Sequence, residues 1–214
     1  MPVSAGPPWL DQRLAAGEVV IIDGGVGTEL EARGAVMDDT AWCGPANLEA
    51  GELLTRIHAD YIAAGADVVI ANTFAAGRQA LEPAGYGAQV VEINRLAVEY
   101  AVRARDAAER EVAVAGAISH FIAPQTGPEW RHPERLAACF REQAEIQAEA
   151  GADLIALEMM QRPEYAEAAM AAAQSTGLPV WLGLCARRAP AGEGFVSISD
   201  PPFAMDEMFA AAGR

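Results

Sequence analysis

Two segments of the chain share the residues Ala-Gly-Ala-Asp followed by a similar apolar run, and they restrict its fold class. Residues 64–74 read AGADVVIANTF, and residues 150–160, which begin 86 positions later, read AGADLIALEMM. In each copy a small residue and a glycine end a helical stretch, an aspartate opens a short apolar run, and polar side chains follow. This pattern is typical of a parallel β-strand that follows a helix, is buried on both faces and carries polar groups at its carboxyl end. The two copies therefore predict a repeated βα scaffold whose strand ends have diverged.

The rest of the chain continues this alternation. Predicted strands occupy residues 19–25, 67–73, 112–118, 153–159 and 179–184, and predicted helices occupy residues 9–16, 47–64, 88–110, 133–150, 163–176 and 205–212. The alternation predicts an α/β fold with a parallel sheet, and the length of 214 residues without a linker predicts one domain over residues 1–214. Two architectures are compatible with it: an open doubly wound sheet, or a (β/α)8 TIM barrel of which about five βα units are present.

Composition and charge exclude several classes of function. All 15 basic residues are arginine, and without lysine the chain can use neither Schiff-base catalysis nor a Walker-type phosphate loop. A formal net charge of −15 argues against nucleic acid or an anionic membrane as a partner. The sequence has no apolar run of about 18 residues and no pattern of a secretory signal, so it predicts a soluble, cytoplasmic protein. The turn GGVGTE, at residues 24–29, is a poor match to a dinucleotide-binding motif.

Polar side chains follow several of the predicted strands. Asp23 ends the first strand, Asn72 and Thr73 end the second, His120 follows the third, and Glu158 lies at the end of the fourth. Sites in parallel α/β proteins form beyond the carboxyl ends of the strands, so we expect these residues to converge. Two carboxylates there can hold an ammonium group, coordinate a hard cation, or act as acid and base. The alternative is that each carboxylate only caps its own turn.

Other chemically capable residues are predicted to be structural. Cys43, Cys139 and Cys185 include no CxxC pair and have no local set of metal ligands around them. His58 lies within a helical pattern and is expected in the core, whereas residues 142–149 are expected to form a solvated helix face.

Three sequence motifs resemble the homocysteine S-methyltransferase family. They are DGGVGTELEARG at residues 23–34, Trp42 shortly after it, and HADYIAAGADVVIANTFAAGRQAL at residues 58–81. The resemblance extends over most of residues 19–184, because AGADLIALEMM and PVWLGL fit the fourth and fifth strands of the family fold. It implies a (β/α)8 barrel with zinc at its carboxyl-end mouth. It also implies transfer of a methyl group from an activated donor to the thiol of homocysteine, which the zinc activates.

The resemblance also implies roles for six residues. Asp23 and Glu158 would bind the amino group of the substrate, and Gly25 and Thr28 would offer hydrogen-bond donors to its carboxylate. Asn72 and Thr73 would line the same pocket. The methyl donor could belong to the S-methylmethionine, S-adenosylmethionine or betaine class.

The sequence departs from the family at the metal site. The zinc-binding cysteines of the family come from a sixth strand and a Gly-Gly-Cys-Cys motif, and no cysteine here matches those positions. A barrel with about five units would leave open edges, so we expect a homo-oligomer that covers them. Two alternative functions stay open. One is a zinc-independent hydrolase or lyase that uses Asp23 and Glu158 on a small polar substrate, and the other is a non-catalytic module that binds a thiol amino acid.

Overall fold

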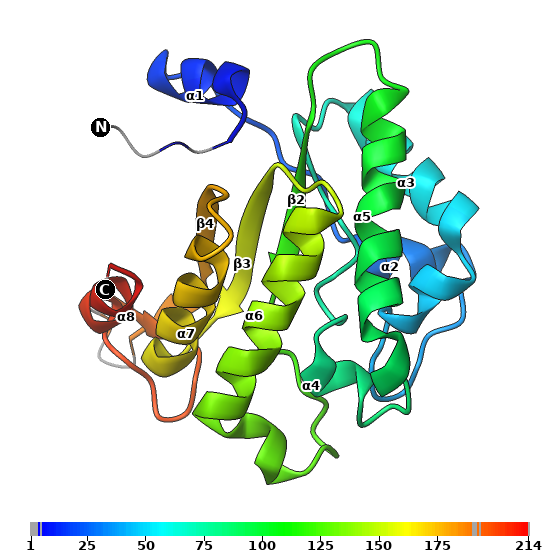
Figure 1. The fold of residues 1–214 in the computed structure, drawn as a ribbon. Helices are drawn as coiled ribbons and strands as arrows, with labels where there is room; N and C mark the ends of the chain where they lie inside the picture. The colour runs from blue at the N-terminus through cyan, green and yellow to red at the C-terminus, as the bar shows by residue number, and fades with distance from the viewer. Residues whose placement is uncertain (1–3, 5, 190–191, 193, 214) are drawn as a thin grey trace.

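A parallel β-sheet forms the centre of the computed structural model, which describes residues 4, 6–189, 192 and 194–213 (Figure 1). Its four strands, in spatial order, are β1 (Val68–Ile70), β2 (Ala113–Ile118), β3 (Leu154–Met160) and β4 (Val180–Leu184). Each strand pairs in parallel with the next one along the chain. This sequential order is that of a barrel wall, because a doubly wound sheet reverses its strand order at a switch point. The fold is therefore of the barrel type, with part of the barrel present in the described residues.

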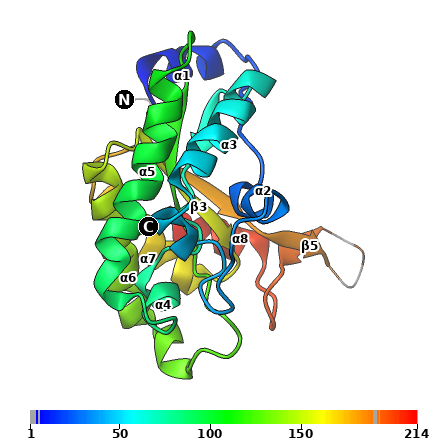
Figure 2. The ribbon, with the colours of Figure 1, turned by 90° about the vertical axis from the view of Figure 1, so that its right-hand side faces the viewer.

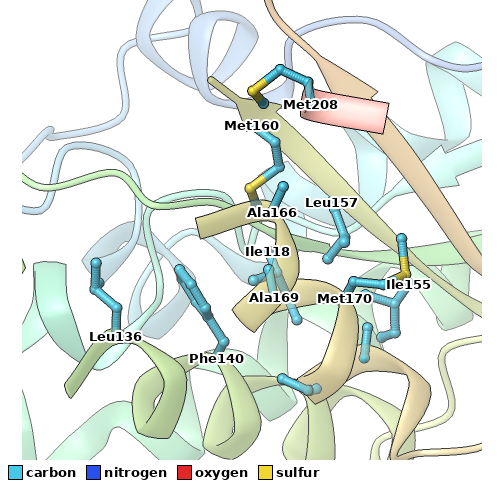
Figure 3. Packing of buried hydrophobic residues seen from close by; sticks show 13 residues of the cluster. Ile118, Leu136, Phe140, Ile155, Leu157, Met160, Ala166, Ala169, Met170 and Met208 are labelled. Carbon is cyan, nitrogen blue, oxygen red and sulfur yellow. The ribbon is translucent and has the colours of Figure 1, made fainter. Parts of the chain in front are cut away.

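Helices cover one face of this sheet (Figure 1). They are α3 (Gly51–Ala64), α5 (Val90–Asp106), α6 (Pro133–Glu149) and α7 (Pro163–Gln174). Figure 3 shows the packing on this face, where Ile155 and Leu157 of β3 lie among Phe140 of α6 and Met170 of α7. The burial of this apolar surface supplies the main stabilisation of the layer.

The opposite face of the sheet has a smaller cover. Helix α1 (Pro8–Ala15) places the fully buried Leu10 against Val68, Ala113 and Leu154, which are the first residues of β1, β2 and β3. In a closed barrel this face would be the interior. Here Trp181 of β4 is only partly buried against the same cluster.

The predicted strand at residues 19–25 is wrong as a regular strand. Only Ile22 pairs with β1, through an isolated parallel bridge to Val68. Two aspartates replace part of the ladder, because the carboxylate of Asp67 accepts the backbone N–H of Ile21 and the carboxylate of Asp23 accepts that of Ile70, each at 2.9 Å. No described strand pairs with the outer edge of this segment, where Ile21 is 52% exposed.

Several elements are absent from the prediction or differ from it, as at the starts of the helices predicted over residues 47–64 and 88–110, where 3-10 turns form. They are α2 (Val26–Ala32), α4 (Arg78–Leu81), three short 3-10 helices (Pro45–Leu48, Gly87–Gln89 and Pro128–Arg131), and an antiparallel hairpin of β5 (Ala186–Arg188) and β6 (Phe195–Ser197). The predicted last helix is α8 (Met205–Ala212). In Figure 2 the hairpin strand β5 projects on the side away from α5 and α6.

The predicted solvated face at residues 142–149 is wrong at four positions, two of which are the buried apolar residues Ala144 and Ile146. Gln143 and Gln147 are buried, and their side-chain amides donate to the backbone oxygens of Thr73 and Ala117, both at 2.8 Å. These carbonyls belong to the ends of β-segments and need donors, and glutamine is long enough to reach them. In the part of the chain that the structure describes, no helix combines the length and apolarity needed to cross a membrane.

Candidate active site at the carboxyl ends of the strands

A cavity of about 490 Å³ lies beyond the carboxyl ends of the strands. Its lining comes from the turn at residues 24–27, from Trp42 and Cys43, from residues 70–72 and Phe74, from Glu158 and Met159, and from residues 183–185. The ends of three strands, β1, β3 and β4, and the first βα turn thus meet at one place, which is where barrel enzymes carry their sites.

Glu158 and Asp23 form the acidic part of this site. Glu158 lines the cavity, and burial raises the pKa of its carboxyl group. Asp23 lies directly behind the wall, since its neighbour Gly24 and its hydrogen-bond partner Ile70 both line the cavity. Burial and the nearby charge of Glu158 raise the pKa of Asp23 to about 7. Its Oδ1 atom is buried without a hydrogen-bond partner, and among the described residues no arginine pairs with either carboxylate.

The glycine turn brings backbone to the cavity wall. Gly25 lines the cavity and precedes the first residue of α2, while Thr28 lies one turn further on, is exposed and does not line it. A side chain at Gly27 would lie 2.7 Å from the ring of Trp42 and 2.8 Å from Sγ of Cys43. Only glycine lets the turn pack this closely against Trp42.

Asn72 and Thr73 are adjacent in sequence but are placed differently. Asn72 is buried and lines the cavity, and its side-chain amide donates to Asn47 Oδ1 at 2.8 Å and to the backbone oxygen of Cys43 at 3.0 Å. Thr73 does not line the cavity. Its hydroxyl donates to the backbone oxygen of Ala117 at 2.9 Å and accepts the N–H of the same residue at 2.8 Å, so it ties the end of β1 to β2.

Two residues of the wall have an unusual backbone. Trp42, with φ of 46°, and Met159, with φ of 56°, are the non-glycine residues of the described chain with positive φ. Both line the cavity, and Met159 also lies where the pairing of β3 with β4 shifts register. Such conformations cost energy and concentrate at functional sites. The ring of Trp42 meets that of Phe74 edge-on at 6.2 Å, which gives the cavity an aromatic side.

A sequence profile described as homocysteine S-methyltransferase matches residues 20–201. The chain belongs to the homocysteine S-methyltransferase family. This confirms the family predicted from the motifs at residues 23–34 and 58–81.

Curated relatives within this family share just under a third of their aligned residues with the chain. Homocysteine S-methyltransferase 2 of Zea mays is 31% identical over 195 residues, which are 81% of this chain and 57% of the relative. The homocysteine S-methyltransferase of Escherichia coli is 31% identical over 76% of this chain and 56% of its own length. Selenocysteine Se-methyltransferase of Brassica oleracea var. italica is 31% identical over 71% and 51%. The chain thus spans little more than half of the length of these relatives.

Solved structures of the homocysteine methyltransferase MmuM from Escherichia coli share the fold. The metallated form aligns with a TM-score of 0.75 and 26% identity over 94% of this chain and 73% of that chain. The oxidised form aligns with a TM-score of 0.70 and 28% identity over 81% of this chain and 64% of that chain. Both alignments support the barrel-type arrangement of the strands.

The described residues of this family member do not fit the zinc site that the resemblance implies. Cys43 and Cys185 line the cavity together with Glu158, but no three His, Cys, Asp or Glu side chains in the described part of the chain are grouped so that they could hold a metal ion. A catalytic zinc needs three protein ligands. Burial also raises the pKa of the Cys43 thiol to about 12, which disfavours the thiolate form that binds metals.

The structure also places the two histidines that the sequence singled out. His58 is fully buried in α3, as predicted, and neither ring nitrogen has a hydrogen-bond partner. His120 lines a second cavity beside the first, together with Arg131 and Gln161. No sequence pattern indicated Arg131, which ends the 3-10 helix Pro128–Arg131. Gln161 directly follows β3, and its position beyond a strand end could have indicated it.

Proposed function

We propose that this chain forms the homocysteine-binding part of an S-methyltransferase. In this reaction the acceptor sulfur gives up its proton and bonds to the methyl carbon. The bond from that carbon to the donor breaks, and its electron pair stays with the donor. Family membership supports the reaction class, and the names of the relatives support a thiol or selenol amino acid as the acceptor. The observation that carries the proposal is the pair Asp23 and Glu158, which has no arginine partner among the described residues.

The acidic pair suits the ammonium group of an amino acid. Glu158 faces the cavity, and Oδ1 of Asp23 is a buried acceptor without a donor. An ammonium group supplies three donors and a positive charge, which satisfy that oxygen and offset the burial of both carboxylates. The positive charge also lowers the pKa of Asp23, so the ligand favours the ionised pair that binds it.

The other end of the amino acid would meet backbone and amide groups. In this proposal Gly25, in the turn before α2, provides a donor to the substrate carboxylate, and Asn72 lines the pocket. Thr28 lies in α2 outside the cavity lining, and its hydroxyl, next to Gly25, is proposed as a second donor. Thr73 contributes indirectly, because its hydroxyl fixes the strand end that carries Asn72. The aromatic side formed by Trp42 and Phe74 would exclude water from the acceptor sulfur.

Zinc and the methyl donor remain predictions of the family resemblance. The described residues include no grouped set of zinc ligands. We therefore assign the residues of the cavity to the binding of substrate and not of zinc. The donor would be of the S-methylmethionine, S-adenosylmethionine or betaine class. Metal analysis of the purified chain separates two cases. About one zinc per chain would require metal ligands that the described residues do not group together. Zinc-free protein that binds homocysteine would establish that this binding does not depend on the metal.

Three further features are proposed with this function. We infer a role in methionine biosynthesis, since methylation of homocysteine on sulfur yields methionine, and a cytoplasmic location. We also propose a homo-oligomer in which copies of the chain cover the open edge beside β1. Its apolar side chains Val19, Ile21 and Ile22 are 76%, 52% and 51% exposed.

Calorimetry with L-homocysteine tests the proposed function. Asp23→Asn and Glu158→Gln each remove one negative charge from the pair, and each is expected to weaken binding about tenfold or more, since each removes an ion-pair partner of the ammonium group. Glu149→Gln is the matched control, because Glu149 is exposed on α6 away from the cavity. Unchanged affinity in both test variants would reject the assigned roles.

One alternative function keeps a specific observation in its favour. In the part of the chain that the structure describes, no three metal-binding side chains are grouped, which is compatible with a module that binds a thiol amino acid without transferring a methyl group. Product analysis after incubation with homocysteine and each class of donor distinguishes the two, because only the transferase forms methionine. The hydrolase or lyase alternative has no such observation in its support.

A further inference from the structure

Asn72 and Glu158 occupy the same position of the repeated segment, because each is the ninth residue of its copy. The side chains of a strand alternate between its two faces. In both copies the residues two and four positions earlier belong to the cluster under α1, namely Ile70 and Val68 in the first copy and Ala156 and Leu154 in the second. Asn72 and Glu158 therefore continue this face at the carboxyl ends of the strands, where both line the cavity of about 490 Å³.

Asn47 fixes the orientation of the Asn72 side chain. It lies in the 3-10 helix Pro45–Leu48 and is fully buried. Its side-chain nitrogen donates to the backbone oxygens of Asn72 at 2.9 Å and of Ile93 at 3.3 Å. Because a carbonyl oxygen can only accept, this side of the Asn47 amide must carry the nitrogen, and Oδ1 must face the other way. There Oδ1 of Asn47 accepts from the side-chain nitrogen of Asn72 at 2.8 Å.

The side-chain oxygen is the group that Asn72 has left for a ligand. Its side-chain nitrogen also donates to the backbone oxygen of Cys43 at 3.0 Å, so both hydrogens of this nitrogen are used. A rotated amide would place its oxygen against two acceptors, which is unfavourable. Among the described residues none donates to Oδ1 of Asn72, and this atom is not sealed in the core as Oδ1 of Asp23 is. Asn72 thus presents a fixed, neutral acceptor at the cavity wall.

Three acceptors match the three donors of a primary ammonium group. The site offers the carboxylates of Asp23 and Glu158 and the side-chain oxygen of Asn72. An amide oxygen in the third position adds an acceptor without adding a third negative charge to the buried pair. An N-methyl group in place of one N–H has no donor, so it leaves one acceptor unpaired and costs affinity. The arrangement therefore favours an unmethylated amino group.

We propose that Asn47 is a positioning residue that holds Oδ1 of Asn72 towards the ligand, and that the two asparagines make the site select primary over N-methylated amino groups. This role rests on the proposed function, because it concerns the ammonium group of the acceptor amino acid. Asn47 does not line the cavity, so it acts through Asn72. An amino acid that differs from the acceptor by one methyl group on nitrogen would then be bound more weakly.

Calorimetry with L-homocysteine and N-methyl-L-homocysteine on the 214-residue chain tests this selection. The unmodified chain should bind the primary amine about tenfold or more tightly. Asn47→Leu and Asn72→Ala should each reduce this preference about fivefold, since each removes the fixed acceptor. Adding Asn47→Leu to Asn72→Ala should change the preference no further, because Asn47 acts through Asn72. The matched control is Asn94→Leu, since Asn94 is a buried asparagine whose amide also donates to two backbone oxygens but does not line the cavity.

Equal binding of the two amines by the unmodified chain overturns the inference, whether or not the variants fold. A full preference in Asn47→Leu or in Asn72→Ala also overturns it, and so does an equal loss in Asn94→Leu, since general loosening of the fold would then explain the effect. Additive losses in the double variant would show that Asn47 acts independently of Asn72 and would likewise overturn it. Tight binding of homocysteine without selection rejects this inference alone. Failure to prefer homocysteine over its des-amino analogue rejects the proposed function itself, and this role with it.

Discussion

Burial and the charge of Glu158, at the end of β3, raise the pKa of Asp23, which lies 135 residues earlier in the chain than Glu158. Both groups are largely buried, and within the described residues neither is neutralised by an arginine. Two uncompensated carboxylates at one position cost folding free energy. A chain that retains them is expected to use them, which connects the electrostatics of the site with the binding of a cationic group.

Asp23→Asn is expected to stabilise the ligand-free protein. The pKa of Asp23 is raised to about 7, so the folded state favours its protonated form and loses stability as the pH rises from about 4 to 7. Asparagine removes this cost, and the free energy of unfolding at pH 8 should rise by up to about 4 kcal/mol. Urea unfolding at pH 8 and pH 4 measures it. A gain as large at pH 4 as at pH 8 would contradict the assigned cause.

Gly27→Ala should damage both packing and the cavity wall. The added methyl group would lie under 3 Å from the ring of Trp42 and from Cys43, so one of them must move. We expect a loss of about 1–3 kcal/mol in unfolding free energy, with a shift in tryptophan fluorescence. The control is Gly87→Ala, whose added group meets only the flexible side chain of Glu82. A variant that is as stable as the unmodified protein would show that the wall is looser than described.

His58→Leu should change the acid stability of the protein. Burial lowers the pKa of His58 to about 4, so its neutral form is favoured by folding; stability is complete above pH 6.5 and is lost as the pH falls towards 4. Between pH 7.5 and pH 4, the free energy of unfolding of the leucine variant should fall by about 3 kcal/mol less than that of the unmodified protein. Urea unfolding across this range measures it, with the exposed His132→Gln as control. Parallel curves for the variant and the unmodified protein would argue against this role.

Ile21→Arg tests the proposed oligomer. Ile21 is 52% exposed on the edge beside β1, so an arginine there fits a monomer but places a charge in an interface that covers this edge. Sedimentation velocity should find an oligomer for the unmodified chain and a monomer for the variant. Glu149→Gln, on α6, serves as control. A monomeric unmodified chain would reject the oligomer.

Regular elements with strong periodicity could be predicted from the sequence. The strand that carries Glu158 was predicted because its apolar run is buried on both faces, and α6 and α7 each begin near a proline that fixes the helix start. The convergence of Glu158 and Asn72 followed from the parallel strands alone. These features depend on local pattern and on one topological rule.

Other features depend on distant contacts that no local pattern records. The segment around Ile22 lacks a second strand partner, so it forms a single bridge although its sequence favours a strand. Gln147 has the polarity of a surface residue but is buried, and its side-chain amide donates to the carbonyl of Ala117, which also accepts the hydroxyl of Thr73. Arg131 ends a 3-10 helix, and only the tertiary fold brings it to the same cavity as Gln161. Tertiary hydrogen bonding thus overrides local preference at these positions.

Binding of homocysteine compared with its des-amino analogue tests the central claim, that the acidic pair recognises an ammonium group. The unmodified chain should bind homocysteine about tenfold or more tightly than the analogue, because only homocysteine offers a cation to Asp23 and Glu158. In the double variant Asp23→Asn, Glu158→Gln this preference should disappear. Equal affinity of the unmodified chain for both ligands would contradict the account.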